Sequence, residues 1–128
     1  MGMTAREHRQ PKSILVVEDD RGIRGLLELI LRRSDRSILL ARDGAEALWL
    51  SRHHDFDLAF VDVHMPGVGG AAFCRAYRED GGDAPVVMLS AATDGPAQAR
   101  ACSADGFIAK PFQIATVLAA VDRHLGAA

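Results

Sequence analysis

The sequence predicts an α/β fold, in which a doubly wound parallel sheet of five strands is covered by helices on both faces. Strand-like and helix-like segments alternate along the whole chain, which is the order of repeated βα units. Two strand-like segments, 14–17 and 86–89, are unbroken apolar runs, as expected of strands buried on both faces. The helix-like segments carry apolar residues three and four positions apart, so each has one face to bury.

The first half of the chain predicts three strands and two helices. The run SILVVE is a compact β-branched segment, and Asp20 is a fair N-cap for the helical period that follows it. The pair Asp43-Gly44 separates the second strand from a short helix that carries Trp49. The expected strands are residues 13–18, 37–41 and 57–63, and the first helix has apolar residues at Ile23, Leu26, Leu27, Ile30 and Leu31.

The second half predicts two further strands and three helices. Gly69-Gly70 leads into a helix that Gly81-Gly82 ends. Asp94-Gly95-Pro96, an N-cap followed by an early proline, opens a helix to about residue 103. The expected strands are 85–91 and 106–110, and the last helix has apolar residues at Ile114, Val117, Leu118, Val121 and Leu125.

Length, composition and charge exclude several classes of protein. The 128 residues fit one domain, and a net charge of −2 offers neither a basic face for nucleic acid nor a polybasic membrane anchor. Residues 1–12 lack the apolar region of a signal peptide, and we expect them to form a flexible tail. Cys74 and Cys102 lack metal-ligand spacing and are expected to be small buried residues of a reduced, cytoplasmic protein.

Chemically reactive side chains follow four of the five predicted strands. In a doubly wound sheet the functional crevice lies beyond the carboxyl ends of the strands. Clustered carboxylates there call for a cation, and oxygen ligands suit Mg²⁺. A hydroxyl and an ammonium beside the ion would hold a phosphoryl group, with Asp62 as the nucleophile. The strand-end residues are Glu18, Asp19, Asp20, Asp62, Ser90 and Lys110.

Four stretches of the chain resemble the signature stretches of the receiver domain of two-component response regulators. They are ILVVEDD, LAFVDVHMPG, VVMLSA and FIAKPF, which occur in the family's order and with familiar separations. The resemblance covers residues 13–125 and implies a flavodoxin-like strand order of 2-1-3-4-5.

The resemblance implies that Asp62 is phosphorylated in a reaction that needs Mg²⁺ or Mn²⁺. Asp19 and Asp62 would bind the ion directly, and Glu18 would bind it through water. The backbone carbonyl of His64, rather than its side chain, would be a further ligand. Asp20 lies past this site, so we expect it to cap the helix instead.

The family pattern also implies a switch that responds to the phosphoryl group. Ser90 and Lys110 would each contact a phosphoryl oxygen, and Phe107 would swing inward as Ser90 moves. The surface formed by the helix at 94–103, the strand at 106–110 and the last helix would then change. The bond from Lys110 to Pro111 is expected to be cis. Ser103 stands where many members have glycine, which is a departure in the turn before strand 5.

The expected phosphoryl donor is a sensor histidine kinase or a histidine phosphotransfer protein. The signal would pass to a downstream protein or to an output domain on a longer chain, and the sequence does not choose between these. No nucleic acid or membrane is expected to bind this domain. The alanines of the last helix could contact a partner or, after phosphorylation, a second copy, although we expect core packing; they are Ala115, Ala119 and Ala120.

Two alternatives to a phosphoacceptor remain open at this point. An aspartate-based phosphatase usually has a second acid two residues after its nucleophile, and His64 stands there. A receiver-like interaction module that takes no phosphate is the second alternative. Residues 67–72 fit the dinucleotide fingerprint G-x-G-x-x-A, but His-Met-Pro separates them from the strand and no acid ends strand 85–91. We therefore expect residues 67–72 to be a flexible loop.

Overall fold

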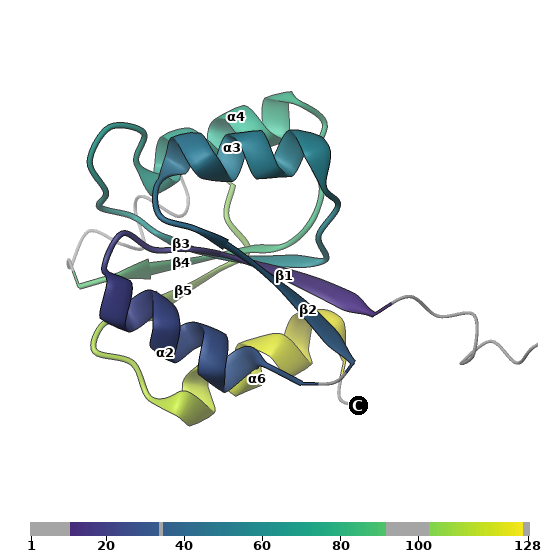
Figure 1. Ribbon diagram of the computed structural model, residues 1–128, viewed down its shortest axis with the longest axis vertical. Coiled ribbons are helices and arrows are strands. Elements are labelled where there is room, and N and C mark those ends of the chain that lie inside the picture. Colours follow the sequence, from purple (N-terminus) through teal and green to yellow (C-terminus); the bar gives the residue numbers. More distant parts are fainter. Residues whose placement is uncertain (1–10, 34, 92–102, 127–128) are drawn as a thin grey trace, which may run out of the picture.

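The structure is a computed structural model that describes residues 11–33, 35–91 and 103–126. Its strands and helices are β1 (Lys12–Val17), α2 (Arg21–Leu31), β2 (Arg36–Ala41), α3 (Gly44–His53), β3 (Leu58–Asp62), α4 (Gly70–Glu79), β4 (Val86–Ser90), β5 (Gly106–Ala109) and α6 (Ile114–Leu125). The strands pair in parallel in the order β2-β1-β3-β4-β5. Helices α3 and α4 cover one face of this sheet, and α2 and α6 cover the other (Figure 1). The predicted fold class and strand order are confirmed.

The observed boundaries differ from the predicted ones by one or two residues. Lys12, which we assigned to the tail, is the first residue of β1, whereas Glu18 lies just past its end. Glu18 still donates its N–H to the carbonyl of Ala41 at 3.0 Å, so the chain stays beside β2 as it leaves the sheet. Cys102 and all but the last residue of the predicted helix at 94–103 fall on residues 92–102, which lie outside the described part of the chain.

Two aspartates that stand near strand ends cap helices. Asp20 accepts a hydrogen bond from the N–H of Ile23 at 2.9 Å at the start of α2, as predicted. Asp43 accepts one from the N–H of Glu46 at 2.8 Å at the start of α3. A side-chain acceptor at this position satisfies a backbone donor that the helix itself cannot pair.

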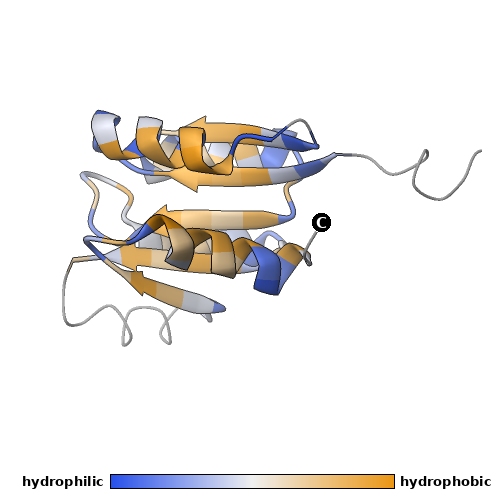
Figure 2. Ribbon diagram, turned by 90° about the horizontal axis from the view of Figure 1, so that it is seen from below, coloured by the Kyte–Doolittle hydropathy of each residue, from blue (hydrophilic) through white to orange (hydrophobic). Residues whose placement is uncertain are grey.

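The core consists of two apolar clusters, one on each face of the sheet. All residues of β3 and β4 are buried. Figure 2 shows that most of the length of the strands is hydrophobic. Cys74 is buried on the α3–α4 side, as predicted. No helix among the described residues is long and apolar enough to cross a membrane.

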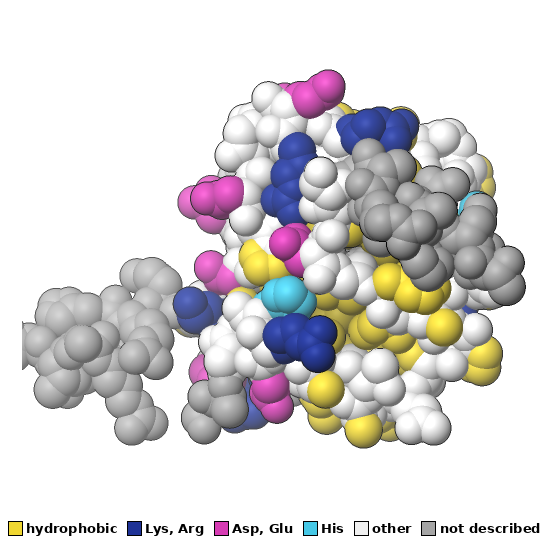
Figure 3. Space-filling view, turned by 180° about the vertical axis from the view of Figure 1, so that it is seen from behind, with side chains coloured by type: hydrophobic (Ala, Val, Ile, Leu, Met, Phe, Trp, Pro, Cys, Tyr) yellow, Lys and Arg dark blue, Asp and Glu magenta, His cyan; other side chains and the backbone are white. Residues whose placement is uncertain are grey.

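The prediction that the α6 alanines pack in the core is wrong for two of them. Val117 and Val121 are fully buried, so they define the stripe of α6 that faces the sheet. Ala115 and Ala119 lie on the outer side and are exposed, whereas Ala120 is partly buried. Seen from behind, the molecule shows a concentration of hydrophobic side chains on part of its surface (Figure 3).

Gly70, which we expected to lie in a flexible loop over residues 67–72, is the first residue of α4 and has a packing role. The N–H of Gly70 donates to the carbonyl of Val63 at 3.0 Å. A Cβ atom on Gly70 would collide with the carbonyl oxygen of Asp62. The first turn of α4 can therefore rest against the end of β3 only because Gly70 has no side chain.

This close approach predicts opposite effects of alanine at two glycines. Gly70→Ala should lower the free energy of unfolding by about 1–3 kcal/mol, because backbone atoms must move to admit the methyl group. Gly25→Ala is the control: a Cβ there meets nothing within 4 Å, and alanine should stabilise the exposed helix α2 by about 0.5–1 kcal/mol. Urea unfolding of both variants measures this, and equal effects would contradict the packing role of Gly70.

Candidate functional site

Carboxylates from two neighbouring strands meet at the carboxyl edge of the sheet. Glu18 and Asp19 follow β1, and Asp62 is the last residue of β3. One carboxylate oxygen from each of the three lies within 4.8 Å of the other two. Glu18 is fully buried and Asp62 is 4% exposed, whereas Asp19 is exposed and leaves the cluster open to solvent on one side.

Lys110 reaches this cluster from the end of β5. Its Nζ atom lies 2.7 Å from Oε1 of Glu18 and 3.3 Å from Oδ2 of Asp62. Its backbone N–H donates to the carbonyl of Ser90 at 2.9 Å, which joins the ends of β4 and β5. The peptide bond between Lys110 and Pro111 is cis.

Ser90 is the last residue of β4 and is fully buried. β4 lies between β3 and β5, so Ser90 ends the strand that separates Asp62 from Lys110. The structure thus brings five of the six predicted strand-end residues to one sheet edge, whereas the sixth, Asp20, caps α2; the five are Glu18, Asp19, Asp62, Ser90 and Lys110.

The remaining predicted residues lie outside this group. His64 is exposed, and its side chain is not part of the carboxylate group. Phe107 is partly buried against the α3–α4 cluster and lines a hollow of about 230 Å³ between β5 and α6. Ser103 has a φ of 59°, so this serine adopts the left-handed conformation that glycine favours.

Two supporting residues of the site were not found from the sequence. The Arg24 guanidinium donates to the carbonyl of Glu18 at 2.8 Å and, more weakly, to that of Asp19 at 3.4 Å. It thereby fixes the backbone of the acidic pair from the first turns of α2. Gly70 is the second, through its contact with Asp62. An arginine six residues after Glu18 does not by itself indicate such a contact. The Gly69-Gly70 pair was noted in the sequence, but it was interpreted as part of a flexible loop.

Burial and charge act against each other in this site. Burial raises the pKa of Glu18 to about 7, although the hydrogen bond from Lys110 opposes the shift. Burial also raises the pKa of Asp62, and the charge of Lys110 opposes it. Burial alone would lower the pKa of Lys110, but its hydrogen bond to Glu18 and the nearby carboxylates raise it. One ammonium therefore does not fully neutralise three carboxylates.

The donor set fits a hard divalent cation. Glu18, Asp19 and Asp62 form the only group of at least three such ligands among the residues that the structure describes. All three offer carboxylate oxygens, which Mg²⁺ and Mn²⁺ prefer, and the exposed side of Asp19 leaves room for water ligands.

Comparison with known proteins identifies the family. Residues 14–122 match the model of the response regulator receiver domain. The chain belongs to this family. It is similar to the response regulator MprA of Mycobacterium sp. (strain KMS), with 38% identity over 112 residues, or 85% of this chain and 48% of that protein. It is 36% identical over 114 residues to the DNA-binding response regulator MtrA of Mycobacterium tuberculosis, covering 88% of this chain and 50% of MtrA. The receiver thus spans about half the length of these relatives.

Solved receiver structures have the same fold. The response regulator TrrA of Thermotoga maritima, solved in complex with Mg²⁺ and BeF, is 31% identical, with a TM-score of 0.79 over 88% of this chain and 97% of that one. The chemotaxis protein CheY4 of Vibrio cholerae is 29% identical, with a TM-score of 0.81 over 88% of this chain and 98% of that one. The chain is therefore a receiver domain of the two-component response regulator type.

The buried position of Glu18 predicts a pH dependence of stability when divalent cations are removed with EDTA. Because its pKa rises from 4.5 to about 7 on folding, the folded state holds this proton more tightly than the unfolded state does. The stability that Glu18 contributes is complete below pH 4.5 and is lost as the pH rises toward 7.

Urea unfolding between pH 4.5 and 7.5 measures this dependence. We expect the free energy of unfolding of the wild type to fall relative to that of Glu18→Gln across the range. Glu28→Gln, which changes a carboxylate on the surface of α2, should run parallel to the wild type. A constant difference between wild type and Glu18→Gln would contradict the burial argument.

Proposed function

We propose that this receiver accepts a phosphoryl group on Asp62 from the phosphohistidine of a sensor histidine kinase or a histidine phosphotransfer protein. In this step an Asp62 carboxylate oxygen forms a bond to phosphorus, and the phosphorus–nitrogen bond breaks. The imidazole leaves and takes up a proton. The observation that carries the proposal is the position of Lys110, whose Nζ lies 3.3 Å from Asp62 Oδ2 beside two further carboxylates.

The attack of a carboxylate on a phosphoryl group requires that the repulsion between two anions be neutralised. An ammonium has three N–H donors. Two face Glu18 and Asp62, and the third can meet a phosphoryl oxygen. The Ser90 hydroxyl, at the neighbouring strand end, is the proposed donor to another oxygen.

A divalent cation, Mg²⁺ or Mn²⁺, would supply the remaining positive charge at the phosphoryl oxygens. Asp19 and Asp62 would hold it directly, Glu18 through water, and the backbone carbonyl of His64 would complete the protein ligands. The burial of Glu18 and Asp62 supports this assignment: burial raises the pKa of both carboxyl groups although Lys110 opposes the shift, and a bound cation would stabilise their ionised forms. Arg24 keeps the backbone of the acidic pair in place from outside the ligand set.

The proposed response begins with movement of Ser90 toward the phosphoryl group and continues to Phe107 on the neighbouring strand. Met88 of β4 pairs with Phe107 in the sheet register, so the two strands are directly connected there. Phe107 is partly buried, which leaves room for a more buried position. The surface around β5 and α6 would then differ between the two states; the predicted helix at 94–103, the third part of that surface, lies mostly outside the described residues.

The domain is proposed to promote its own phosphorylation and dephosphorylation without turning over external substrates. In place of the second acid of an aspartate-based phosphatase it has His64, whose side chain is exposed. We place the protein in the cytoplasm. Because the matched relatives are about twice as long and one is a DNA-binding regulator, the signal would pass to an output domain on a longer chain or to a separate protein.

Intact mass after incubation with acetyl phosphate tests the proposal. With Mg²⁺ we expect the wild type to gain one phosphoryl group, and Asp62→Asn to gain none. Asp20→Asn is the matched control, because Asp20 caps α2 and asparagine is an equally good cap; it should be phosphorylated like the wild type.

Each result of this experiment has a distinct meaning. No gain under any condition would favour the receiver-like interaction module that takes no phosphate. A gain that persists in Asp62→Asn would show that another residue is the acceptor. Repeated release of phosphate from a generic phosphate ester would favour the phosphatase.

Cation binding can be tested without phosphorylation. Mg²⁺ should raise the melting temperature of the wild type, and ten times its dissociation constant should add about 1.4 kcal/mol to the free energy of unfolding. Asp19→Asn should abolish most of this effect, whereas Asp20→Asn should keep it. Equal stabilisation of all three proteins by Mg²⁺ would contradict the ligand assignment.

A further inference from the structure

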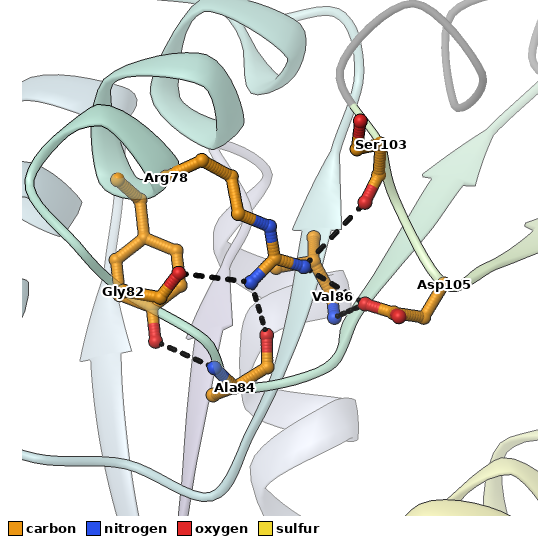
Figure 4. Close-up of polar contacts among 7 residues, drawn as sticks. Arg78, Gly82, Ala84, Val86, Ser103 and Asp105 are labelled. Atoms are coloured by element: carbon orange, nitrogen blue, oxygen red, sulfur yellow. Dashed lines mark hydrogen bonds and ion pairs between the residues drawn. The ribbon is translucent and has the colours of Figure 1, made fainter.

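We propose that Arg78 is a positioning residue for Ser90 and Lys110, and that it acts from the opposite end of β4 and β5. The inference rests on the proposed function, because it concerns how Ser90 and Lys110, the two residues proposed to contact the phosphoryl group, are held side by side at the ends of β4 and β5. Figure 4 shows the Arg78 side chain extending from α4 into the space between the loops that precede the two strands.

The guanidinium group binds both of these loops. Nη1 donates to the carbonyls of Gly82 and Ala84, at 3.2 and 2.8 Å, in the loop before β4. Nη2 forms an ion pair with Oδ2 of Asp105 at 2.9 Å and lies 3.5 Å from the carbonyl of Ser103, both before β5. The side chain is 23% exposed, so solvent screens these contacts only in part.

Asp105 converts this contact into a constraint on strand register. Its Oδ2 atom, besides binding Arg78, accepts the N–H of Val86 at 2.8 Å, and its own N–H donates to the carbonyl of Val86 at 2.7 Å. Val86 is the first residue of β4, and β5 begins directly after Asp105. Arg78 therefore anchors the residue that aligns the starts of the two strands.

β5 has few other interactions to fix its position. It is a four-residue edge strand that pairs only with β4, and Ile108 is its only buried residue. A slip of one residue would move its backbone by about 3.3 Å and turn its side chains to the other face. Such a slip would remove Lys110 from Glu18 and Asp62, which are now 2.7 and 3.3 Å away.

Native-state hydrogen exchange of Arg78→Met tests the inference directly. The probe is the Lys110 amide, which donates to the carbonyl of Ser90 at the far end of the strands. We expect it to exchange at least tenfold faster than in the wild type. The reference is the Glu18 amide, bonded to Ala41 at the same sheet edge; it should change less than twofold.

Arg52→Met is the matched control for losing an arginine ion pair. Arg52 binds Asp80 at 2.9 Å near the end of α4 but has no contact with the starts of β4 and β5 among the described residues. It should leave the Lys110 amide unchanged. If Arg78→Met does not fold, Asp105→Asn removes the same ion pair with little change of shape and should show the same pattern more weakly.

A purely structural role would give different results. Faster exchange confined to residues 80–86 and 103–106, or an equal increase at the Glu18 and Lys110 amides, would overturn the inference. The rate of phosphorylation is a second test. Arg78→Met should react with acetyl phosphate at least fivefold more slowly than the wild type, while the Mg²⁺ concentration that gives half of the maximal rate should be unchanged. If the wild type takes no phosphoryl group, the proposed function fails, while the exchange experiment still decides the role of Arg78.

Discussion

The contact of the Lys110 ammonium with two buried carboxylates is the interaction on which the rest of the site depends. Glu18 and Asp62 lie almost wholly out of solvent, and each would be costly to ionise without a positive partner. Lys110 reaches both, although 92 residues separate it from Glu18 in the chain. The three groups meet because β1, β3, β4 and β5 lie side by side in the sheet and Glu18, Asp62 and Lys110 stand at their ends.

This arrangement leaves the site short of positive charge. Lys110 pairs with two of the three clustered carboxylates, and the pKa values of Glu18 and Asp62 are raised as a result of burial. A group of this kind favours the arrival of a cation and then of an anion that the cation and Lys110 can share. The same imbalance that costs stability in the resting protein therefore favours phosphoryl binding. In the proposed function, both the phosphorylation of Asp62 and the movement that follows it depend on this attraction of the site for a cation and a phosphoryl group.

Most of the fold could be predicted from the sequence because its signals are local. Unbroken apolar runs identified the buried strands, Asp20 marked the start of α2 by its hydrogen-bonding chemistry, and the Asp43-Gly44 pair marked the break before α3. The carboxylates and Lys110 were identifiable because strand ends gather at one edge of a parallel sheet.

The sequence did not predict which side chains contact one another across the fold. The choice of Glu18 as the closer partner of Lys110, the contact of Arg24 with the acidic backbone and the connection of Arg78 to two loops depend on side-chain placement across the fold. The exposure of Ala115 and Ala119 depends on how α6 is rotated on the sheet, which periodicity alone did not specify. Gly70 is a similar case: the sequence showed a glycine before the expected helix, but it did not show that this glycine packs against the carbonyl of Asp62.

A crystal structure with Mg²⁺ and beryllofluoride would show directly whether Asp62 is the phosphoryl acceptor and Lys110 its partner. We expect beryllium bonded to an Asp62 carboxylate oxygen, Mg²⁺ beside Asp19 and Asp62, and the Lys110 Nζ atom within hydrogen-bonding distance of a fluoride. Beryllofluoride bound at another residue, or an Asp62 that stays unmodified while Lys110 keeps both carboxylate contacts, would contradict this assignment.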